Sequence, residues 1–419
     1  MIREDKKMDI KIEMPNEVSM ILNKLSEKGY EAVIIGGCVR DSIMGIEPHD
    51  WDIATSAQPE EIMECFKEYN IMTAGLKHGT VTVIIDHVPY EITTYRVDGE
   101  YSDHRRPDSV SFTSDLAEDI LRRDFTINAM AYDGEKIIDL HNGMRDLWTG
   151  TIRCVGNAND RIREDPLRIM RAIRFAARFG FVIERKTEKA MFNNCDMLKM
   201  IAMERKQSEF SKAICSEHVD VLKKYPKILS YVFPAADQIK DFETAIDMVG
   251  ECKDISEKLA IMIDGLALSK YNKAVKVILS GMRYPNKIVN SVGNIILGKR
   301  MLIINTDVCI KNMLYKYSLE DVKHILHYKY AKIKYSTILN KEKIMGEILQ
   351  MIKAAEHLAE SDNCHNLKGL AVNGKDLKSL GVDDLEIKGK LEGLLNLVIT
   401  KQVENKRDAL IEVAKISML

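Results

Sequence analysis

Two acidic residues in an otherwise apolar segment carry the strongest chemical signal in the sequence. Asp50 and Asp52 lie two positions apart in PHDWDIA. Asp50 directly precedes a strand predicted at 51–55, and Asp52 lies within it. Because alternate side chains of a strand point to the same side, the two carboxylates converge while Trp51 and Ile53 face the core. Like charges this close raise each other's pKa unless a cation lies between them, and Mg²⁺ prefers oxygen ligands. The spacing therefore predicts a metal site at Asp50 and Asp52, with Mg²⁺ as the cofactor.

A glycine pair shortly before the aspartates is suited to bind phosphate. The segment IIGGCVRD (34–41) has the pattern of a strand, a turn at Gly36 and Gly37, and a helix, which exposes backbone N–H groups to an anion. Arg40, in the first helical turn, adds a charged donor. With the metal, these features predict a site for a nucleotide polyphosphate. The alternative is a simple tight turn beside an exposed strand end; the occurrence of both features so close together favours the functional interpretation.

An arginine-rich segment, DPLRIMRAIRFAARFG (165–180), predicts an amphipathic helix. Pro166 suits the first helical position, so Asp165 is expected at the N-cap. An Asp acceptor and an Arg donor on one helix face can pair with the Watson–Crick edge of a base, and clustered arginines are typical of phosphate contact. The alternative is a solvated helix face supported by an Asp–Arg pair. The arginines of this stripe are Arg168, Arg171, Arg174 and Arg178.

The bulk properties limit the class of protein. A chain of 419 residues is expected to form two to four domains. The net charge of -2 predicts no polyanion partner by itself, so any basic surface must be local. The eight cysteines include no C-x-x-C pair and are expected to be reduced thiols. The sequence shows neither a signal peptide nor an apolar run long enough for a membrane span, which predicts a cytoplasmic protein without membrane contact.

Strand and helix signals divide the chain into two parts. The first part mixes both: helices are expected at 15–29 and 58–69, and strands at 31–37, 51–55, 79–86, 90–97 and 136–140. After about residue 160 the strand signal disappears, and helices are expected at 165–180, 202–225, 257–268, 288–302, 318–332 and 341–361. The predicted fold is therefore an α+β head with a mixed sheet, followed by an elongated all-α remainder.

Taken together, the motifs resemble the class II tRNA nucleotidyltransferases, the CCA-adding enzymes, within the nucleotidyltransferase superfamily that includes DNA polymerase β. The resemblance extends over nearly the whole chain. It is carried by GGCVRD (36–41), DWD (50–52), GLKHGTVTV (75–83), RRDFTINAMA (122–131), IRCVGNANDRIREDPLRIMRAIRF (152–175) and ERKQSEFSK (204–212).

The resemblance implies a head with the mixed sheet of DNA polymerase β. It also implies template-independent addition of nucleotides to tRNA. The 3′-hydroxyl of tRNA would attack the α-phosphate of CTP or ATP and release pyrophosphate, without a nucleic-acid template. Two metal ions about 4 Å apart, held by Asp50 and Asp52, would assist the transfer. Glu91 is a weaker candidate for a third carboxylate.

Roles for the other motif residues follow from the same resemblance. Gly37, Arg40 and Arg123 would contact the triphosphate, and Asp124 would bind the ribose 2′-hydroxyl. Asp165 and Arg168 would act as the protein template, because C and A share an amino donor beside a ring-nitrogen acceptor whereas G and U present the opposite pattern. Arg171 and Arg174 would support the template helix and the phosphates.

The resemblance also implies four domains. They are a catalytic head (1–155), a helical neck that recognises the base (156–213), an RNA-binding body (214–315) and a tail for the tRNA elbow (316–419). The segment 97–112 fits the mobile element associated with addition of the final A. A poly(A) polymerase or a partial (CC- or A-) adding enzyme is the alternative, although the strand GLKHGTVTV lacks the basic RF pattern typical of bacterial poly(A) polymerases.

Two departures from the family pattern stand out. Pro166 replaces a more usual small helix former in the template motif and could shift the start of that helix. In the tail, which resembles that of CCA-adding enzymes from Gram-positive bacteria, Lys388, Gly389 and Lys390 replace a common Ile-Gly.

Overall fold

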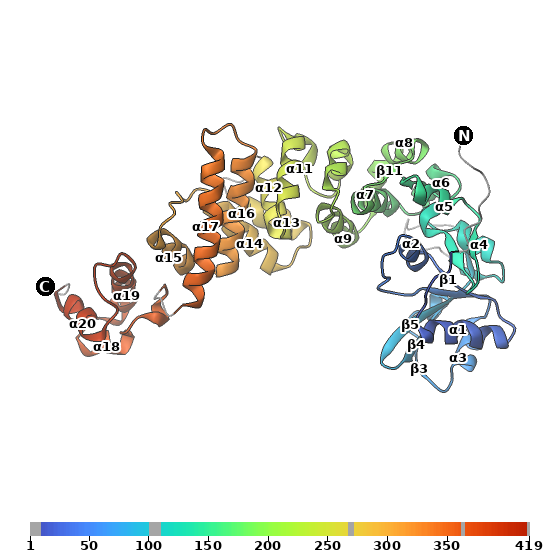
Figure 1. The fold of residues 1–419 in the computed structure, drawn as a ribbon, viewed down its shortest axis with the longest axis horizontal. Helices are drawn as coiled ribbons and strands as arrows, with labels where there is room; N and C mark the ends of the chain where they lie inside the picture. The colour runs from blue at the N-terminus through green and yellow to red at the C-terminus, as the bar shows by residue number, and fades with distance from the viewer. Residues whose placement is uncertain (1–9, 100–109, 267–271, 362–364, 417–419) are drawn as a thin grey trace. The chain divides into compact units, whose positions relative to one another are not determined.

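The chain folds into two compact units, Met1–Val232 and Phe233–Leu419 (Figure 1). The structure is a computed structural model that describes residues 10–99, 110–266, 272–361 and 365–416. The expected mixed head and helical remainder are both present, so the predicted fold class is confirmed. No helix in the described part of the chain combines the length and apolarity that a membrane crossing requires.

A seven-stranded mixed sheet forms the centre of the head. Its strand order is β3-β4-β5-β2-β1-β8-β9, and all neighbours are antiparallel except β2 and β5. The central strand β1 is almost fully buried, which explains its continuous apolar run of Val33, Ile34 and Ile35. The strands of this sheet are β1 (Ala32–Ile35), β2 (Ile53–Thr55), β3 (Asn70–Met72), β4 (Thr80–Ile85), β5 (Val88–Thr94), β8 (Met130–Tyr132) and β9 (Ile137–Asp139).

Short helices connect the strands of the head. α3 begins at Pro59, and the side chains of Gln58 and Glu61 form a capping box at its N-terminus. A separate hairpin, β6 (Arg96–Asp98) with β7 (Val110–Phe112), flanks residues 100–109, so most of the expected mobile element lies outside the described residues. The helices of the head are α1 (Asn16–Glu27), α2 (Gly37–Ile43), α3 (Pro59–Cys65), α4 (Leu116–Leu121) and α5 (Gly143–Trp148).

The rest of the first unit is helical, with two differences from expectation. The single helix predicted at 202–225 is wrong: α9 ends at Ile214, because the chain turns there and the His218 N–H donates to the carbonyl of Ala177. A short strand, β11 (Val182–Ile183), pairs in parallel with β10 (Thr151–Ile152), although no strand was expected after residue 160. The helices are α6 (Ala158–Glu164), α7 (Leu167–Phe179), α8 (Arg185–Asn194), α9 (Met203–Ile214) and α10 (Pro226–Leu229).

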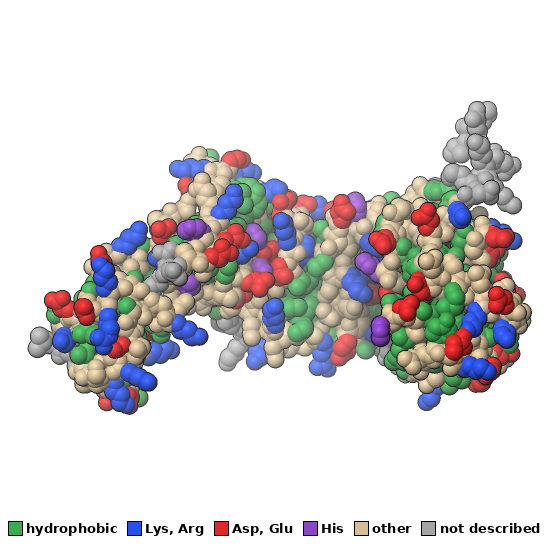
Figure 2. Space-filling model, turned by 60° about the horizontal axis from the view of Figure 1, so that its bottom comes forward, with side chains coloured by type: hydrophobic (Ala, Val, Ile, Leu, Met, Phe, Trp, Pro, Cys, Tyr) green, Lys and Arg blue, Asp and Glu red, His purple; other side chains and the backbone are tan. Residues whose placement is uncertain are grey.

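The second unit is built from helices. The last three helices enclose a small core of their own, centred on Leu377, Leu395 and Leu410. On the face shown in Figure 2, basic and acidic side chains are interspersed, which agrees with the near-neutral net charge. The helices are α11 (Phe242–Glu251), α12 (Ile255–Gly265), α13 (Asn272–Gly281), α14 (Asn286–Gly298), α15 (Asp307–Lys316), α16 (Leu319–Lys334), α17 (Lys341–Glu360), α18 (Gly374–Ser379), α19 (Asp384–Ile399) and α20 (Arg407–Ile416).

A partly buried carboxylate links three helices of the second unit. Asp264 on α12 pairs with Lys299, which follows α14, and with Lys332 on α16, and it accepts a hydrogen bond of 2.8 Å from the Tyr328 hydroxyl. Burial alone would raise its pKa, but the bonds with Lys299, Tyr328 and Lys332 hold the pKa of Asp264 at about 2. The carboxylate therefore stabilises this unit in its ionised form.

Replacement of this carboxylate should give a pH-dependent loss of stability. We expect Asp264→Asn to lower the free energy of unfolding of the second unit by about 2 kcal/mol near pH 7. Because the folded pKa lies below that of an unfolded Asp, the difference from wild type should be constant above pH ~5 and narrow as the pH falls towards 2. Urea unfolding followed by circular dichroism at several pH values measures this difference in the free energy of unfolding.

A matched control is available on α17. Glu342→Gln removes an exposed carboxylate from the first turn of α17 in the same unit and should lower stability by no more than about 0.5 kcal/mol. An equal effect of both substitutions, or an Asp264→Asn deficit that persists at pH 2, would contradict the assignment.

Candidate active site

The residues assigned from the sequence to metal, phosphate, ribose or base contact, Glu91 excepted, line one cavity of about 620 Å³ in the first unit. Helix α7, the β1–α2 turn, the segment before β2 and the segment after α4 form its walls. Seven arginines and four aspartates surround it, so the cavity is suited to a ligand that carries several negative charges. The lining residues are Gly36, Gly37, Arg40, Asp50, Asp52, Arg122, Arg123, Asp124, Asn128, Asp165, Arg168, Arg171, Arg174, Phe175 and Arg178.

Asp50 and Asp52 lie together at this cavity, but not within a strand. β2 begins only at Ile53, which is 1% exposed, and the Asp52 carbonyl accepts a hydrogen bond of 3.0 Å from the Ile35 N–H. Both aspartate side chains are exposed, and neither forms an ion pair or a side-chain hydrogen bond with another described residue. Desolvation raises the pKa of Asp52; the charge of Arg123 opposes this shift and that of Asp50 adds to it.

These two carboxylates fit a divalent cation. Their oxygens are uncommitted, and a cation between them would relieve their mutual repulsion. No lysine is among the residues that line this cavity. The β2–β5 register extends to place Glu91 beside Asp52, yet Glu91 does not line the cavity, and the described residues contain no group of three His, Cys, Asp or Glu side chains placed for a metal.

The glycine turn makes room for an arginine. Gly36 has φ +87°, and a Cβ at this position would lie 2.8 Å from Nη1 of Arg123. The Gly36 N–H donates to the Met130 carbonyl at 3.0 Å, so it is not available to an anion, contrary to the expectation that the turn exposes its N–H groups. Gly37 begins α2 and lines the cavity. The turn thus leaves room for the guanidinium of Arg123, whose charge acts on Asp52.

Alanine at this turn should affect both stability and the position of Arg123. We expect Gly36→Ala to destabilise the head by about 1–3 kcal/mol, from backbone strain, and to weaken nucleotide binding because Arg123 must move. Gly45→Ala is the matched control, since Gly45 has φ +71° but open space around it. Thermal unfolding of both variants measures the cost of backbone strain, and CTP titration measures the effect of displacing Arg123. Unchanged CTP affinity in Gly36→Ala would contradict the expected displacement of Arg123.

Arg40 is part of the cavity wall. Its side chain is buried, donates to Asp41 through Nε at 2.8 Å and to Asn128 through Nη1, and lies over the rings of Phe175 and Phe179. Burial lowers its pKa, and the neighbouring Asp41 opposes that shift. These contacts fix the guanidinium, so its predicted contact with phosphate would have to use the edge that faces the cavity.

Asp124 is tied to helix α7. Its Oδ2 accepts from Nε of Arg171 at 2.8 Å, and its Oδ1 accepts from the Phe125 N–H and the Asn128 amide. Although burial would raise its pKa, the ion pair with Arg171 brings the pKa of Asp124 down to about 2. A ribose hydroxyl that donates to Asp124 would therefore have to share or displace one of these donors.

The template segment begins as the sequence suggests. Asp165 has extended backbone angles, its Oδ1 accepts from the Leu167 N–H at 3.0 Å, and Pro166 has helical angles. This is the bonding pattern of an N-cap followed by proline at the first helical position. Pro166 is thus compatible with the motif.

Arg168 does not pair with Asp165. It is 8% exposed and donates to Glu164 and to the carbonyls of Arg161 and Arg122, at 2.7–2.9 Å. The arginine stripe is therefore not an ordinary solvated helix face, because its first member is buried and its later members line the cavity.

Comparison with known proteins assigns the chain to a family. The family model described as "Poly A polymerase head domain" matches residues 32–153, and the one described as "Probable RNA and SrmB- binding site of polymerase A" matches residues 180–239. The chain is 34% identical over 403 residues to the CCA-adding enzyme of Lactiplantibacillus plantarum, with 94% of each chain covered. The chain belongs to the CCA-adding enzymes.

Other relatives agree. The CCA-adding enzyme of Enterococcus faecalis is 33% identical over 418 residues, with 96% of this chain and 97% of the relative covered. The crystal structure of the Bacillus stearothermophilus CCA-adding enzyme in complex with CTP matches with a TM-score of 0.79 at 27% identity, over 97% of this chain and 98% of that one. The predicted family, a nucleotidyltransferase family, is confirmed.

In this CCA-adding family member, helix α9 contributes two residues that hold side chains of the cavity wall and that sequence reasoning missed. Arg205 donates from Nη2 to Oδ2 of Asp165 at 2.9 Å, and the buried Glu209 pairs with Arg174. Both belong to the segment ERKQSEFSK, which carried part of the resemblance but no assigned role. The signal was present as a motif, whereas the partners are separated by 35 residues or more and could not be inferred from spacing.

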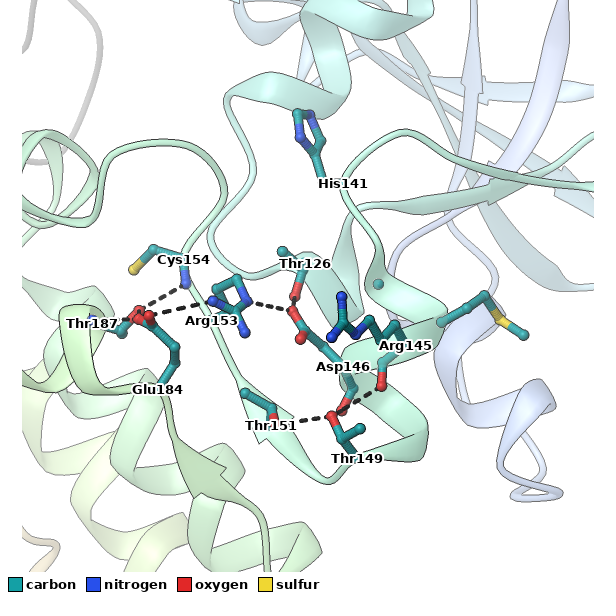
Figure 3. A network of polar contacts seen from close by, with 12 residues as sticks. Thr126, His141, Arg145, Asp146, Thr149, Thr151, Arg153, Cys154, Glu184 and Thr187 are labelled. Carbon is teal, nitrogen blue, oxygen red and sulfur yellow. Dashed lines mark hydrogen bonds and ion pairs between the residues drawn. The ribbon is translucent and has the colours of Figure 1, made fainter. Parts of the chain in front are cut away.

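A polar network connects the head to the helices after it within the first unit (Figure 3). Arg153 lies between Asp146, which accepts from its Nε at 2.9 Å, and Glu184, the N-cap of α8. Asp146 is buried and also accepts a hydrogen bond of 2.7 Å from the Thr126 hydroxyl. Because Thr126 is two residues from Asn128, this network helps to fix the cavity wall.

Proposed function

We propose that this protein adds C, C and A to the 3′ end of tRNA, using CTP and ATP and releasing pyrophosphate. The observation that carries the proposal is the convergence of Asp50, Asp52, Asp124, Asp165 and the predicted arginines on one cavity. Full-length similarity to CCA-adding enzymes supports it.

Asp50 and Asp52 would hold Mg²⁺. When bound, the metal supplies charge stabilisation at the phosphoryl oxygens and lowers the pKa of an attacking hydroxyl. The two uncommitted, exposed carboxylates support this assignment, because every other aspartate that lines the cavity is engaged by an arginine or a backbone N–H.

Arg123, Gly37 and Arg40 would bind the triphosphate. Nε of Arg123 is buried and has no hydrogen-bond partner among the described residues. A cationic donor left unpaired inside a cavity is costly unless a ligand satisfies it, and a phosphate oxygen is the natural acceptor. Arg171 and Arg174 add positive charge, and Asp124 would accept from the ribose.

Asp165 and Arg168 would read the base. Asp165 offers acceptor oxygens to the exocyclic amino group that C and A share, and Arg168 offers a donor to the ring nitrogen beside it. Arg205 and Glu164 hold these two side chains in place.

The helical segments after the head would bind tRNA. We assign base recognition to 156–213, RNA binding to 214–315 and contact with the tRNA elbow to 316–419. The near-neutral net charge requires these contacts to come from local basic groups.

Sequencing the 3′ ends of reaction products tests the proposal. A tRNA transcript that lacks its terminal trinucleotide is incubated with Mg²⁺ and CTP, ATP or both. We expect CC with CTP alone and CCA with both nucleotides. Runs of A that form without CTP would instead indicate a poly(A) polymerase, and products that end at CC with both nucleotides would indicate a partial adding enzyme.

A further inference from the structure

A buried carboxylate outside the cavity holds two of the arginines that line it. Asp119, on α4, is 1% exposed and does not line the cavity itself. Its Oδ1 accepts from Nε and Nη2 of Arg122 at 3.0 and 2.6 Å, and its Oδ2 accepts from Nη2 of Arg123 at 3.3 Å. Both oxygens of one carboxylate are therefore used to fix two neighbouring guanidinium groups.

The bond to Arg123 leaves its other donors for a ligand. Only Nη2 of Arg123 is held by Asp119; Nη1 lies against Gly36, and Nε has no partner in the described part of the chain. A guanidinium anchored at one nitrogen loses less conformational freedom when a phosphate binds the others.

The environment of Asp119 favours its ionised form. Burial acts against ionisation, but the two arginines outweigh it, so the pKa of Asp119 lies below its usual value. The Arg96 N–H, at the start of β6, donates to the same Oδ1 at 3.3 Å. The carboxylate is thus a fixed counter-charge at the back of the nucleotide site.

We propose that Asp119 is a positioning residue that aims Arg122 and Arg123 into the nucleotide cavity and thereby sets the affinity for the triphosphate. This inference rests on the proposed function, since it assumes that the cavity binds CTP and ATP. Asp119 acts through the arginines and does not contact the nucleotide.

CTP binding by the full chain, measured by calorimetry, tests the proposal. Asp119→Asn keeps the size of the side chain and removes its charge. We expect it to weaken the binding of CTP and of ATP by about tenfold each, because a charge-assisted hydrogen bond to the arginines is weakened. Affinity for tRNA should stay near wild type, whereas the thermal unfolding temperature should fall, because the lowered pKa of Asp119 means that its ionised form stabilises the folded head. Glu118→Gln, an exposed neighbour on the same helix, should leave CTP binding unchanged.

A double-mutant cycle separates positioning from a general structural role. In an Arg123→Met background, Asp119→Asn should lose most of its effect on CTP affinity, because the guanidinium that it orients is absent. If the two substitutions instead weaken CTP affinity by independent factors that multiply in the double variant, the proposal is wrong. If Asp119→Asn unfolds, Asp119→Glu retains the charge and moves the carboxylate, and it should still weaken CTP binding.

The outcomes distinguish this inference from the proposed function. If wild type adds CCA and folded Asp119 variants bind CTP within about twofold of wild type, the positioning role is wrong and the proposed function stands. If wild type binds CTP but adds nothing to tRNA while Asp119→Asn weakens binding, the positioning role is supported and the proposed function fails.

Discussion

Replacing Asp50 with alanine should lower the rate of nucleotide addition by about three orders of magnitude. Loss of a metal ligand removes several kcal/mol of transition-state stabilisation, and about 4 kcal/mol corresponds to a factor of ~10³. Asp50 is exposed and has no ion pair or side-chain hydrogen bond with another described residue, so its removal should cost little folding energy. Single-turnover addition of C to tRNA with saturating CTP and Mg²⁺ measures the effect.

The control for this substitution lies three residues earlier. Glu47→Ala removes an exposed carboxylate from the same segment without touching the cavity, and it should keep the wild-type rate. Affinity for tRNA should be unchanged in both variants, because the substitution acts on the chemical step. A normal rate for Asp50→Ala in the presence of Mg²⁺ would mean that the metal assignment is wrong.

Much of this site could be predicted because its signals are local. The spacing of Asp50 and Asp52, the glycine pair and the arginine stripe each depend on a few neighbouring residues, and helical periodicity places the arginines of α7 on one face. The structure brings these separate predictions together in one cavity.

What sequence reasoning missed depends on contacts between distant segments. The contacts of Arg205 with Asp165 and of Arg153 with Glu184 join elements that no periodicity relates. The strands β3 and β8 were missed for the same reason: they are only three residues long, and their pairing with neighbouring strands defines them. The break after α9 likewise follows from a hydrogen bond to α7.

Asparagine at position 165 should shift base choice from C towards U. Oδ1 of Asp165 caps the Leu167 N–H, and an asparagine oxygen can keep that bond. The amide NH₂ then replaces Oδ2, so a donor stands where the site offered an acceptor. C presents an amino donor at this edge and U presents a carbonyl acceptor. We expect the preference for CTP over UTP, as the ratio of kcat/KM values, to fall by about 10–100-fold, or roughly 1–3 kcal/mol.

Asp165 is a cleaner probe of the template than Arg168. Arg168 donates to the carbonyls of Arg161 and Arg122, so its removal would leave buried acceptors unpaired and would disturb the fold as well as base choice. Asp160→Asn, at an exposed position on α6, is the matched control and should retain the wild-type ratio.

The contact of Asp165 with Arg205 predicts a change of base preference towards U and not only a general loss of selectivity. In the wild-type site its Nη2 donates to Oδ2 of Asp165; with asparagine, two donors face each other, and the acceptor that best relieves this conflict is a base carbonyl. UTP should therefore gain in absolute efficiency while CTP loses, and tRNA affinity should remain near wild type. An unaltered CTP-to-UTP ratio in Asp165→Asn would show that this side chain does not read the base.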